Sequence, residues 1–248
     1  MKSDATRRQF IKNSSSLMAA PYFAPVAALG LGKTVAPSDR IVMGAIGCGG
    51  KGKHNTQQFL NDERVQVIAA CDVDSEHLKT ATQKINQHYN TSDCQTFEDF
   101  RDLLQVKGLD AVHVSTPDHW HAVAAVHAMR QCKDVYCEKP LAHTVREARL
   151  MQDEYKKRKG EIATQMGTQI HATGNYRRAV EIVQSGILGA VTEAHVWCSR
   201  GISSVGQAVL PEQPVPETFD WDVWLGPAAN RPYNKSYWSG GNLNWNRR

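Results

Sequence analysis

The stretch of sequence that decides the fold is RIVMGAIGCGGKGKHNTQQFLNDERVQVIAACDVD, residues 40–74. An apolar run at 41–46 leads into a glycine-rich turn, and a second apolar run at 65–71 ends on Asp72. A strand, a Gly-x-Gly-x-x-Gly turn, a helix and a second strand ending in an acidic residue are the layout of a dinucleotide-binding unit. The sequence therefore predicts a nucleotide site at this turn.

Each glycine of the Gly-x-Gly-x-x-Gly turn has a physical role. Gly47 permits the tight turn, Gly49 lets the backbone approach a pyrophosphate, and Gly52 lets the next helix pack closely on the strand. The N-terminal N–H groups of that helix would then face the phosphates. Asp72 can accept hydrogen bonds from both ribose hydroxyls. A Walker-type phosphate loop is excluded, because Lys51 is followed by glycine and not by Ser or Thr.

Composition and charge are those of a globular protein. Of the 248 residues, 41% are hydrophobic and 22% charged, enough for one large domain or one and a half. The net charge of +4 comes from the N-terminus: residues 1–37 hold five of the 29 basic residues and one of the 25 acidic residues. The rest of the chain is balanced, so we expect no nucleic-acid partner.

The N-terminus carries an export pattern. Two arginines, a polar residue, an aromatic, an aliphatic and a lysine at 7–12 match a twin-arginine signal, followed by an apolar stretch at 17–31. This stretch is too short for a stable membrane span and contains Pro21 and Pro25. We expect the twin-arginine translocation machinery as a partner and a periplasmic or otherwise exported location. Cleavage after Ala27 or Ala28 and an uncleaved membrane anchor both stay open.

Twin-arginine export has a chemical consequence. Substrates of this route cross the membrane folded, so a cofactor can be loaded before export. No nicotinamide pool exists outside to exchange with. We therefore expect the cofactor to be held tightly and regenerated in place.

From residue 38 onward, strand and helix patterns alternate, which predicts an α/β fold with a doubly wound parallel sheet. We divide the chain into a signal and linker (1–37), a nucleotide-binding Rossmann domain (38–167) and the start of a second α/β domain (168–248). Asp118 is expected to cap one helix, and Thr144 to open another with a capping box. A helix at 174–186 should turn Val180, Ile182 and Val183 inward, and we expect no regular elements after residue 201. The expected strands are 41–46, 65–71, 93–96, 111–116, 134–138, 161–167 and 191–199, with further helices at 75–89, 96–105 and 144–159.

The six cysteines form neither a Cys-x-x-Cys pair nor a zinc spacing. We expect free thiols, with Cys48 and Cys71 as small buried residues. Asp118, His119 and His121 would point in different directions from the start of a helix, so no metal site is expected.

Two further motifs follow predicted strands. Ser-Thr-Pro-Asp-His-Trp-His occupies 115–121, and Glu-Lys-Pro occupies 138–140. With the glycine turn and Asp72, they resemble the Gfo/Idh/MocA family, that of glucose–fructose oxidoreductase and inositol dehydrogenase. The resemblance is strong over about residues 40–191, and residues 221–227 look like a segment common in exported members. It implies a Rossmann domain followed by an α/β domain with an open sheet, a bound NAD or NADP, and sugar or polyol substrates.

The resemblance also implies roles for individual residues. Lys139 would be catalytic, hydrogen-bonding the reacting hydroxyl and stabilising alkoxide charge. Pro140 is a candidate for a cis bond that would aim this lysine. Gln169, His171 and Tyr176 are candidates for the substrate pocket, although a capped strand end explains the first two equally well. The cofactor-binding set would be Gly47, Gly49, Gly50, Gly52, Asp72, Thr116, Pro117, His121, Glu138 and Lys139.

NAD is favoured over NADP, because the Asp72 carboxylate repels a 2′-phosphate and no arginine follows it. The resemblance also implies that the general base is an Asp/His pair beyond an Asn-Trp-Arg-like segment. That segment occupies 244–247 here, one residue before the last. We therefore expect a C-terminally truncated chain that turns over little. Members of this family often dimerise or tetramerise, so we expect a homo-oligomer at full length.

Three functions remain open at this stage. The first is NAD(P)-dependent oxidation of a secondary alcohol in a sugar, glycoside or polyol. The second is redox-neutral glycoside hydrolysis, in which NAD oxidises a ring hydroxyl and the hydride is later returned. The third is nucleotide binding without turnover.

Overall fold

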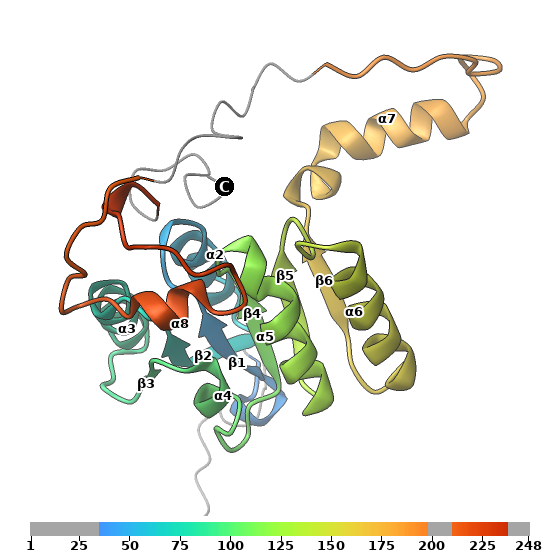
Figure 1. The fold of residues 1–248 in the computed structure, drawn as a ribbon. Helices are drawn as coiled ribbons and strands as arrows, with labels where there is room; N and C mark the ends of the chain where they lie inside the picture. Colours follow the sequence, from blue (N-terminus) through green and yellow to red (C-terminus); the bar gives the residue numbers. More distant parts are fainter. Residues whose placement is uncertain (1–34, 198–209, 238–248) are drawn as a thin grey trace, which may run out of the picture. The chain divides into compact units, whose positions relative to one another are not determined.

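The computed structural model describes residues 35–197 and 210–237. It contains a six-stranded sheet in the order β3-β2-β1-β4-β5-β6 (Figure 1). All five pairings are parallel. The α/β doubly wound class predicted from the sequence is confirmed. The strands are β1 (Ile41–Ile46), β2 (Val65–Cys71), β3 (Gln95–Phe97), β4 (Ala111–Val114), β5 (Asp134–Glu138) and β6 (Thr164–Gly167).

Helices cover both faces of this sheet. One apolar cluster joins the strands to α4, α5 and α6, and a second joins them to α2 and α3. The strands are therefore buried on both sides, as a parallel sheet requires. The helices are α2 (Gly50–Leu60), α3 (Ser75–Tyr89), α4 (Phe100–Leu103), α5 (Asp118–Arg130), α6 (Val145–Lys157), α7 (Gly174–Gln184) and α8 (Trp221–Leu225), with 3₁₀ turns η2 (Pro37–Asp39), η3 (Gln169–Ala172) and η4 (Lys235–Tyr237). The turn η2 belongs to an N-terminal unit separate from the one that begins at Ile41.

Helix ends follow their local signals with one exception. The Thr144 capping box is present, and Gly186, with φ 73°, lies in the left-handed region just after α7. The exception is Asp118, which was expected to cap α5. Pro117 occupies the N-cap position, and Asp118 is the first residue of the helix.

Several predicted bounds are corrected by strand pairing. The strand expected at 93–96 is observed at Gln95–Phe97 as β3, because Thr96 and Phe97 pair with Ala70 and Cys71. The helix expected from 96 therefore begins only at Phe100, capped by Asp99. The fourth and sixth strands are also shorter than the predicted 111–116 and 161–167.

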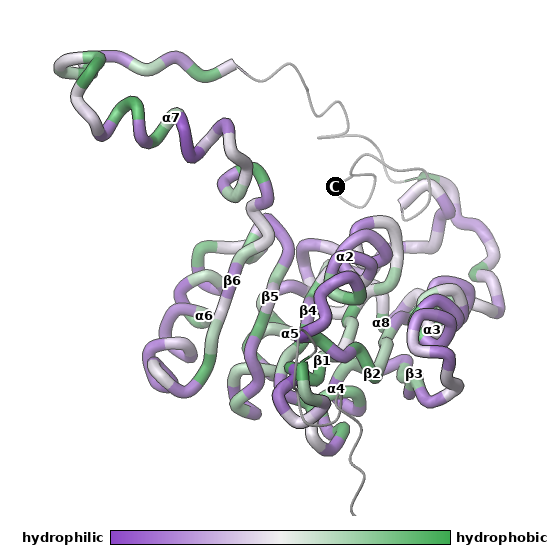
Figure 2. Tube along the Cα trace, turned by 180° about the vertical axis from the view of Figure 1, so that it is seen from behind, coloured by the Kyte–Doolittle hydropathy of each residue, from purple (hydrophilic) through white to green (hydrophobic). Residues whose placement is uncertain are grey.

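The segment after the sheet departs most from prediction. Val180, Ile182 and Val183 of α7 are 51%, 40% and 50% exposed, so they are not turned inward within the described part of the chain. Figure 2 shows hydrophobic and hydrophilic stretches alternating along α7. Residues 191–197 have no regular secondary structure and are not part of the six-stranded sheet, so the strand expected at 191–199 is not formed there. Residues 198–199 of that expected strand lie outside the described residues.

The expectation of no regular elements after residue 201 is wrong, because this part of the chain contains α8 and η4. It also has an ordered cluster of its own. Phe219, Trp221, Leu225, Tyr233 and Tyr237 are buried together, and Val73 packs against them. Val73, in the loop between β2 and α3, thus contributes to a core made by the C-terminal segment.

Cys48 and Cys71 are buried, as predicted, and the five described cysteines are free thiols. Among the helices at 35–197 and 210–237, none combines the length and the apolar composition that a membrane span requires. The twin-arginine pattern lies outside those ranges.

Candidate nucleotide-binding site

The carboxyl ends of the central strands define the site. After β1 the chain enters α2, on one face of the sheet, and after the neighbouring β4 it enters α5, on the other. Such a switch point opens a crevice in which ligands of doubly wound sheets bind. The glycine turn and residues 115–117 lie at these two strand ends.

The glycine turn can be built only from glycines at two positions. Gly47 has φ 84°, and a Cβ there would lie 2.7 Å from the Thr116 backbone nitrogen. A Cβ on Gly52 would lie 1.8 Å from the Gly47 carbonyl oxygen. Gly49 caps α2 and Gly50 is its first residue, so unpaired N–H groups of the first helical turn surround them. These groups can bind a pyrophosphate.

Asp72 lies at the end of β2, beside the glycine turn. Its carboxylate accepts the Cys48 N–H at 2.6 Å and the Asp74 N–H at 2.9 Å. Burial raises the pKa of this carboxyl, and the two N–H donors offset part of the effect. The carboxylate therefore orders the turn while keeping further acceptor capacity for ribose hydroxyls.

Glu138, at the end of β5, is buried in a polar network. Its Oε1 accepts the Asn55 Nδ2–H at 2.9 Å and lies 3.7 Å from Lys51 Nζ, while Oε2 accepts the Lys139 N–H at 3.3 Å. Asn55 also donates to Ser115 Oγ at 3.0 Å. The helix that begins at the glycine turn is thereby fastened to the ends of β4 and β5.

His113 continues this network into the core. Its Nδ1 lies 3.1 Å from Ser115 Oγ, and its Nε2 lies 3.0 Å from Thr56 Oγ1. The ring stacks on Phe59 with centroids 5.6 Å apart. Burial lowers the pKa of His113 to about 4, so the ring is neutral at physiological pH.

His121 connects the two remaining motifs. Its Nδ1 lies 2.6 Å from the Pro140 carbonyl oxygen, and its Nε2 lies 2.8 Å from the Thr116 carbonyl oxygen. The ring is almost fully buried, and it joins the loop after β4 to the loop after β5. The Lys139–Pro140 bond is cis, as considered from the sequence, and Lys139 itself is exposed. Lys139 is thus presented to solvent from an anchored turn.

The other predicted residues lie in varied surroundings. Thr116 Oγ1 is buried without a hydrogen-bond partner in the described structure, which leaves a polar atom for a ligand. Gln169, His171 and Tyr176 are exposed on η3 and α7, and the rings of the last two lie 6.0 Å apart. They follow Gly167, the last residue of β6, which pairs with Glu138, the last residue of β5. They therefore continue from the carboxyl end of the sheet, where Glu138 also lies.

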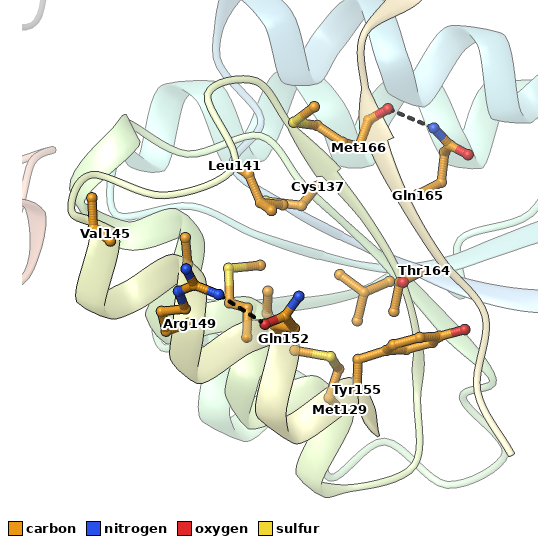
Figure 3. A pocket seen from close by; sticks show the side chains of 14 residues that line it. Met129, Cys137, Leu141, Val145, Arg149, Gln152, Tyr155, Thr164, Gln165 and Met166 are labelled. Atoms are coloured by element: carbon orange, nitrogen blue, oxygen red, sulfur yellow. Dashed lines mark hydrogen bonds between the residues drawn. The ribbon is translucent and has the colours of Figure 1, made fainter. Parts of the chain in front are cut away.

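An apolar cavity of about 460 Å³ lies elsewhere, between α5, α6 and strands β5 and β6. Figure 3 shows Val145, Arg149, Gln152 and Tyr155 of α6 on one side of it. Arg149 donates to Gln152 at 3.5 Å. The described lining contains no carboxylate or histidine, so we place no chemistry there.

Several residues of the site were missed from the sequence. Lys51 and Asn55 are four residues apart, a spacing that places both on one face of α2. His113 and Ser115 are two apart and point to the same side of the extended chain. These spacings were available signals. The contacts of Lys51 and Asn55 with Glu138, and of Asn55 with Ser115, depend on the tertiary fold.

The strand order, the glycine cradle, Asp72 and the orphaned Thr116 hydroxyl all fit a dinucleotide, and together they define a Rossmann-type nucleotide-binding protein. A family model described as "Oxidoreductase family, NAD-binding Rossmann fold" matches residues 41–166. A second, "Oxidoreductase family, C-terminal alpha/beta domain", matches residues 173–240. The chain belongs to the Gfo/Idh/MocA oxidoreductase family.

The chain is similar in sequence to glycosyl hydrolases of family 109. Glycosyl hydrolase family 109 protein 1 of Shewanella sp. strain MR-4 is 29% identical over 205 residues, covering 74% of this chain and 43% of that protein. The chain therefore spans less than half the length of this relative.

Among solved structures, scyllo-inositol dehydrogenase from Lactobacillus casei with bound NAD(H) and scyllo-inositol is 25% identical, with a TM-score of 0.56 over 62% of this chain and 43% of that one. Myo-inositol 2-dehydrogenase from Lactobacillus plantarum is 26% identical, with a TM-score of 0.55 over 60% and 42%.

Proposed function

We propose that the chain is the nucleotide-binding part of an NAD-dependent oxidoreductase that acts on a secondary alcohol of a sugar, glycoside or polyol. The observation that carries this proposal is the spacing of Asp72 and Lys139 across the sheet. They follow β2 and β5, which are separated by β1 and β4. Neighbouring strands lie about 4.8 Å apart, so roughly 14 Å separates the two ends. An extended dinucleotide could engage Asp72 with one half and Lys139 with the other.

The proposed chemistry assigns a role to each anchored group. The bound nicotinamide would supply the hydride acceptor. The Lys139 ammonium would hydrogen-bond the substrate hydroxyl and stabilise negative charge developing on its oxygen. Glu138, held by Asn55, would fix the backbone from which the lysine extends. The similarity to inositol dehydrogenases supports a polyol-like substrate.

We further propose NAD over NADP. The Asp72 carboxylate would lie against a 2′-phosphate, and Val73 and Asp74 follow it without a cation. Calorimetric titration tests this directly: we expect NAD to bind and NADP to bind at least about tenfold more weakly, a difference of about 1.4 kcal/mol. Replacing Asp72 by Ser should reduce that preference. Equal affinities in the unchanged chain would refute the assignment.

Hydride transfer is tested by mixing the chain with NAD and a panel of sugars and polyols and following NADH absorbance. The variant Lys139→Ala and the matched control Lys107→Ala, an exposed lysine on another loop, separate the proposed role from a general loss of charge. Nucleotide binding with no NADH from any member of the panel would favour the third function, binding without turnover.

A redox-neutral glycoside hydrolase is the second candidate, favoured by the glycosyl hydrolase names of the sequence relatives. In this case NAD is reduced and reoxidised within one cycle. A glycoside substrate would release free sugar while the bound NAD shows no net reduction. Accumulation of NADH in proportion to substrate would exclude this alternative.

We also propose export by the twin-arginine route, on the pattern at residues 7–12. The double substitution Arg7→Lys and Arg8→Lys keeps the charge and should stop translocation of the whole chain in a fractionation experiment. Continued export of this variant would refute the proposal.

A further inference from the structure

A segment of the C-terminal part of the chain, residues 215–225, runs against the loop that follows Asp72. We call this segment the strap. Ser75 N–H donates to the Thr218 carbonyl at 2.9 Å, and Asp220 N–H donates to the Val73 carbonyl at 3.0 Å. Between them, Asp74 and Phe219 form an antiparallel bridge. The strap thus adds a short extended pairing directly beside the predicted ribose-binding carboxylate.

The other end of the strap is fixed to the start of α5. His119 Nε2 lies 2.7 Å from the Trp224 carbonyl oxygen, and Trp120 Nε1–H donates to the carbonyls of Val223 and Trp224, each at 3.0 Å. The His119 and Trp224 rings also meet edge to face, 5.3 Å apart. The start of α5 directly follows Thr116 and Pro117. The strap therefore spans from the loop after β2 to the start of α5, the helix that follows β4.

The strap is ordered by its own core. Phe219 and Trp221 are 6% and 7% exposed, and Trp221 stacks on Trp224 with centroids 4.9 Å apart. Trp221 Nε1–H donates to the Arg231 carbonyl at 2.9 Å. Figure 1 shows α8 lying beside α3 and the ends of β2 and β3. Buried rings, ring stacking and this hydrogen bond therefore fix the position of the strap.

The strap also encloses space next to this loop. A cavity of about 470 Å³ lies between the strap and residues Val73, Ser75 and Glu98. The described lining contains acidic residues but neither lysine nor arginine. These acids are Glu98, Glu217, Asp220 and Asp222. An uncharged, hydrogen-bonding group is compatible with such surroundings, whereas an additional phosphate is not.

We propose that the strap is the outer wall of the site for the adenosine half of the dinucleotide and slows its release. This inference rests on the proposed nucleotide-binding function and adds a specific element to it. A second-domain segment closes the end of the site farthest from Lys139, so that the cofactor is retained by a contact between the two family domains. The acids along the strap add to the exclusion of a 2′-phosphate.

The test removes strap contacts without touching the glycine turn or Asp72. Ser75 is the first residue of α3, a position where proline is tolerated, and Asp74 has the extended backbone (φ −101°, ψ 111°) that suits a residue before proline. Ser75→Pro therefore deletes the N–H that binds the strap, while Ser75→Ala keeps it as a matched control. Trp120→Phe removes the indole donor and keeps an aromatic ring.

We expect the double variant Ser75→Pro/Trp120→Phe to bind NAD about tenfold more weakly than the Ser75→Ala control, with a faster dissociation rate, measured by calorimetry and by stopped-flow displacement. AMP should lose affinity by a similar factor and NMN should lose none, because the strap lies at the adenosine end. Circular dichroism checks that the variants remain folded.

Unchanged NAD affinity in the folded double variant would overturn the proposal, and so would tighter binding, which would mean that the strap blocks the site. A loss of NMN affinity equal to that of AMP would also overturn it. Asp72→Ala separates this outcome from failure of the proposed function. If NAD binds the unchanged chain and Asp72→Ala abolishes that binding, the nucleotide site stands even when the strap proposal fails.

Discussion

The buried His113 should make the stability of the fold depend on pH in a defined direction. Its ring is fully buried, and its pKa is lowered from 6.5 to about 4 because burial removes the water that would solvate an imidazolium. In the unfolded chain the same ring takes up a proton below pH 6.5. Between those two pH values the unfolded state binds more protons than the native state, so stability falls as pH falls.

The size of the effect follows from the shift. Each pH unit corresponds to about 1.4 kcal/mol, so acidification from above pH 6.5 to about pH 4 should cost about 3 kcal/mol in total from this one group. About 2 kcal/mol of that should be lost by roughly pH 5. This is a substantial part of the roughly 5–15 kcal/mol by which domains are stable.

Urea unfolding at about pH 7, 6 and 5 measures the effect, with His113→Gln as the comparison. Glutamine keeps hydrogen-bonding atoms for Thr56 and Ser115 but does not titrate. The pKa of His127 is also lowered by partial burial, and its contribution cancels because both proteins contain it. Equal pH dependence in the two proteins, or an NMR titration of the His113 ring with a midpoint near 6.5, would refute the reasoning.

Three further results are expected at the site. Gly52→Ala would drive a Cβ into the Gly47 carbonyl of the turn, so NAD affinity should fall about 100-fold by calorimetry. A Cβ on Gly50 meets nothing within 4 Å, so Gly50→Ala should lower NAD affinity much less in the same titration. NAD affinity should rise with pH through the raised pKa of Asp72, because ribose hydroxyls bind the ionised carboxylate, and an Asp72→Asn titration should be flat. If the unchanged chain forms NADH, Lys139→Ala should lower kcat for hydride transfer about 10²–10³-fold while Lys107→Ala does not, as steady-state kinetics would show.

Elements with strong local signals could be predicted from the sequence. The predicted bounds of β1, β2, α3 and β5 are those observed. Each is a continuous pattern bounded by a turn or a capping residue, so little depends on distant partners. The glycine turn and Asp72 belong to the same category, because their geometry is set within about thirty residues of chain.

Elements defined by pairing could not be predicted in the same way. The position of β3 is set by its register on β2, which no local pattern contains. For α7, the helical spacing of Val180 and Val183 indicates an apolar face but not what covers it. The meeting of Asn55, Ser115 and Glu138 joins residues up to 83 apart in sequence, beyond the reach of periodicity.

The order of the aromatic segment after residue 201 could not be predicted from sequence periodicity either. Its lack of period predicts no regular elements, yet α8 and η4 form there. Its order comes instead from tryptophan and tyrosine rings packed on one another and on Val73. Irregular backbone is fixed here by side-chain packing, which a search for repeating patterns does not detect.

The long sequence separation between the strap and its docking loop bears on how the protein is made. The sheet is complete once Gly167 has been synthesised, but Phe219 follows only about fifty residues later. At about 5–20 residues per second, a ribosome needs several seconds for that interval. The nascent first domain can therefore fold with this edge still uncovered, and docking of Phe219 beside Asp74 would be among the last events of its maturation.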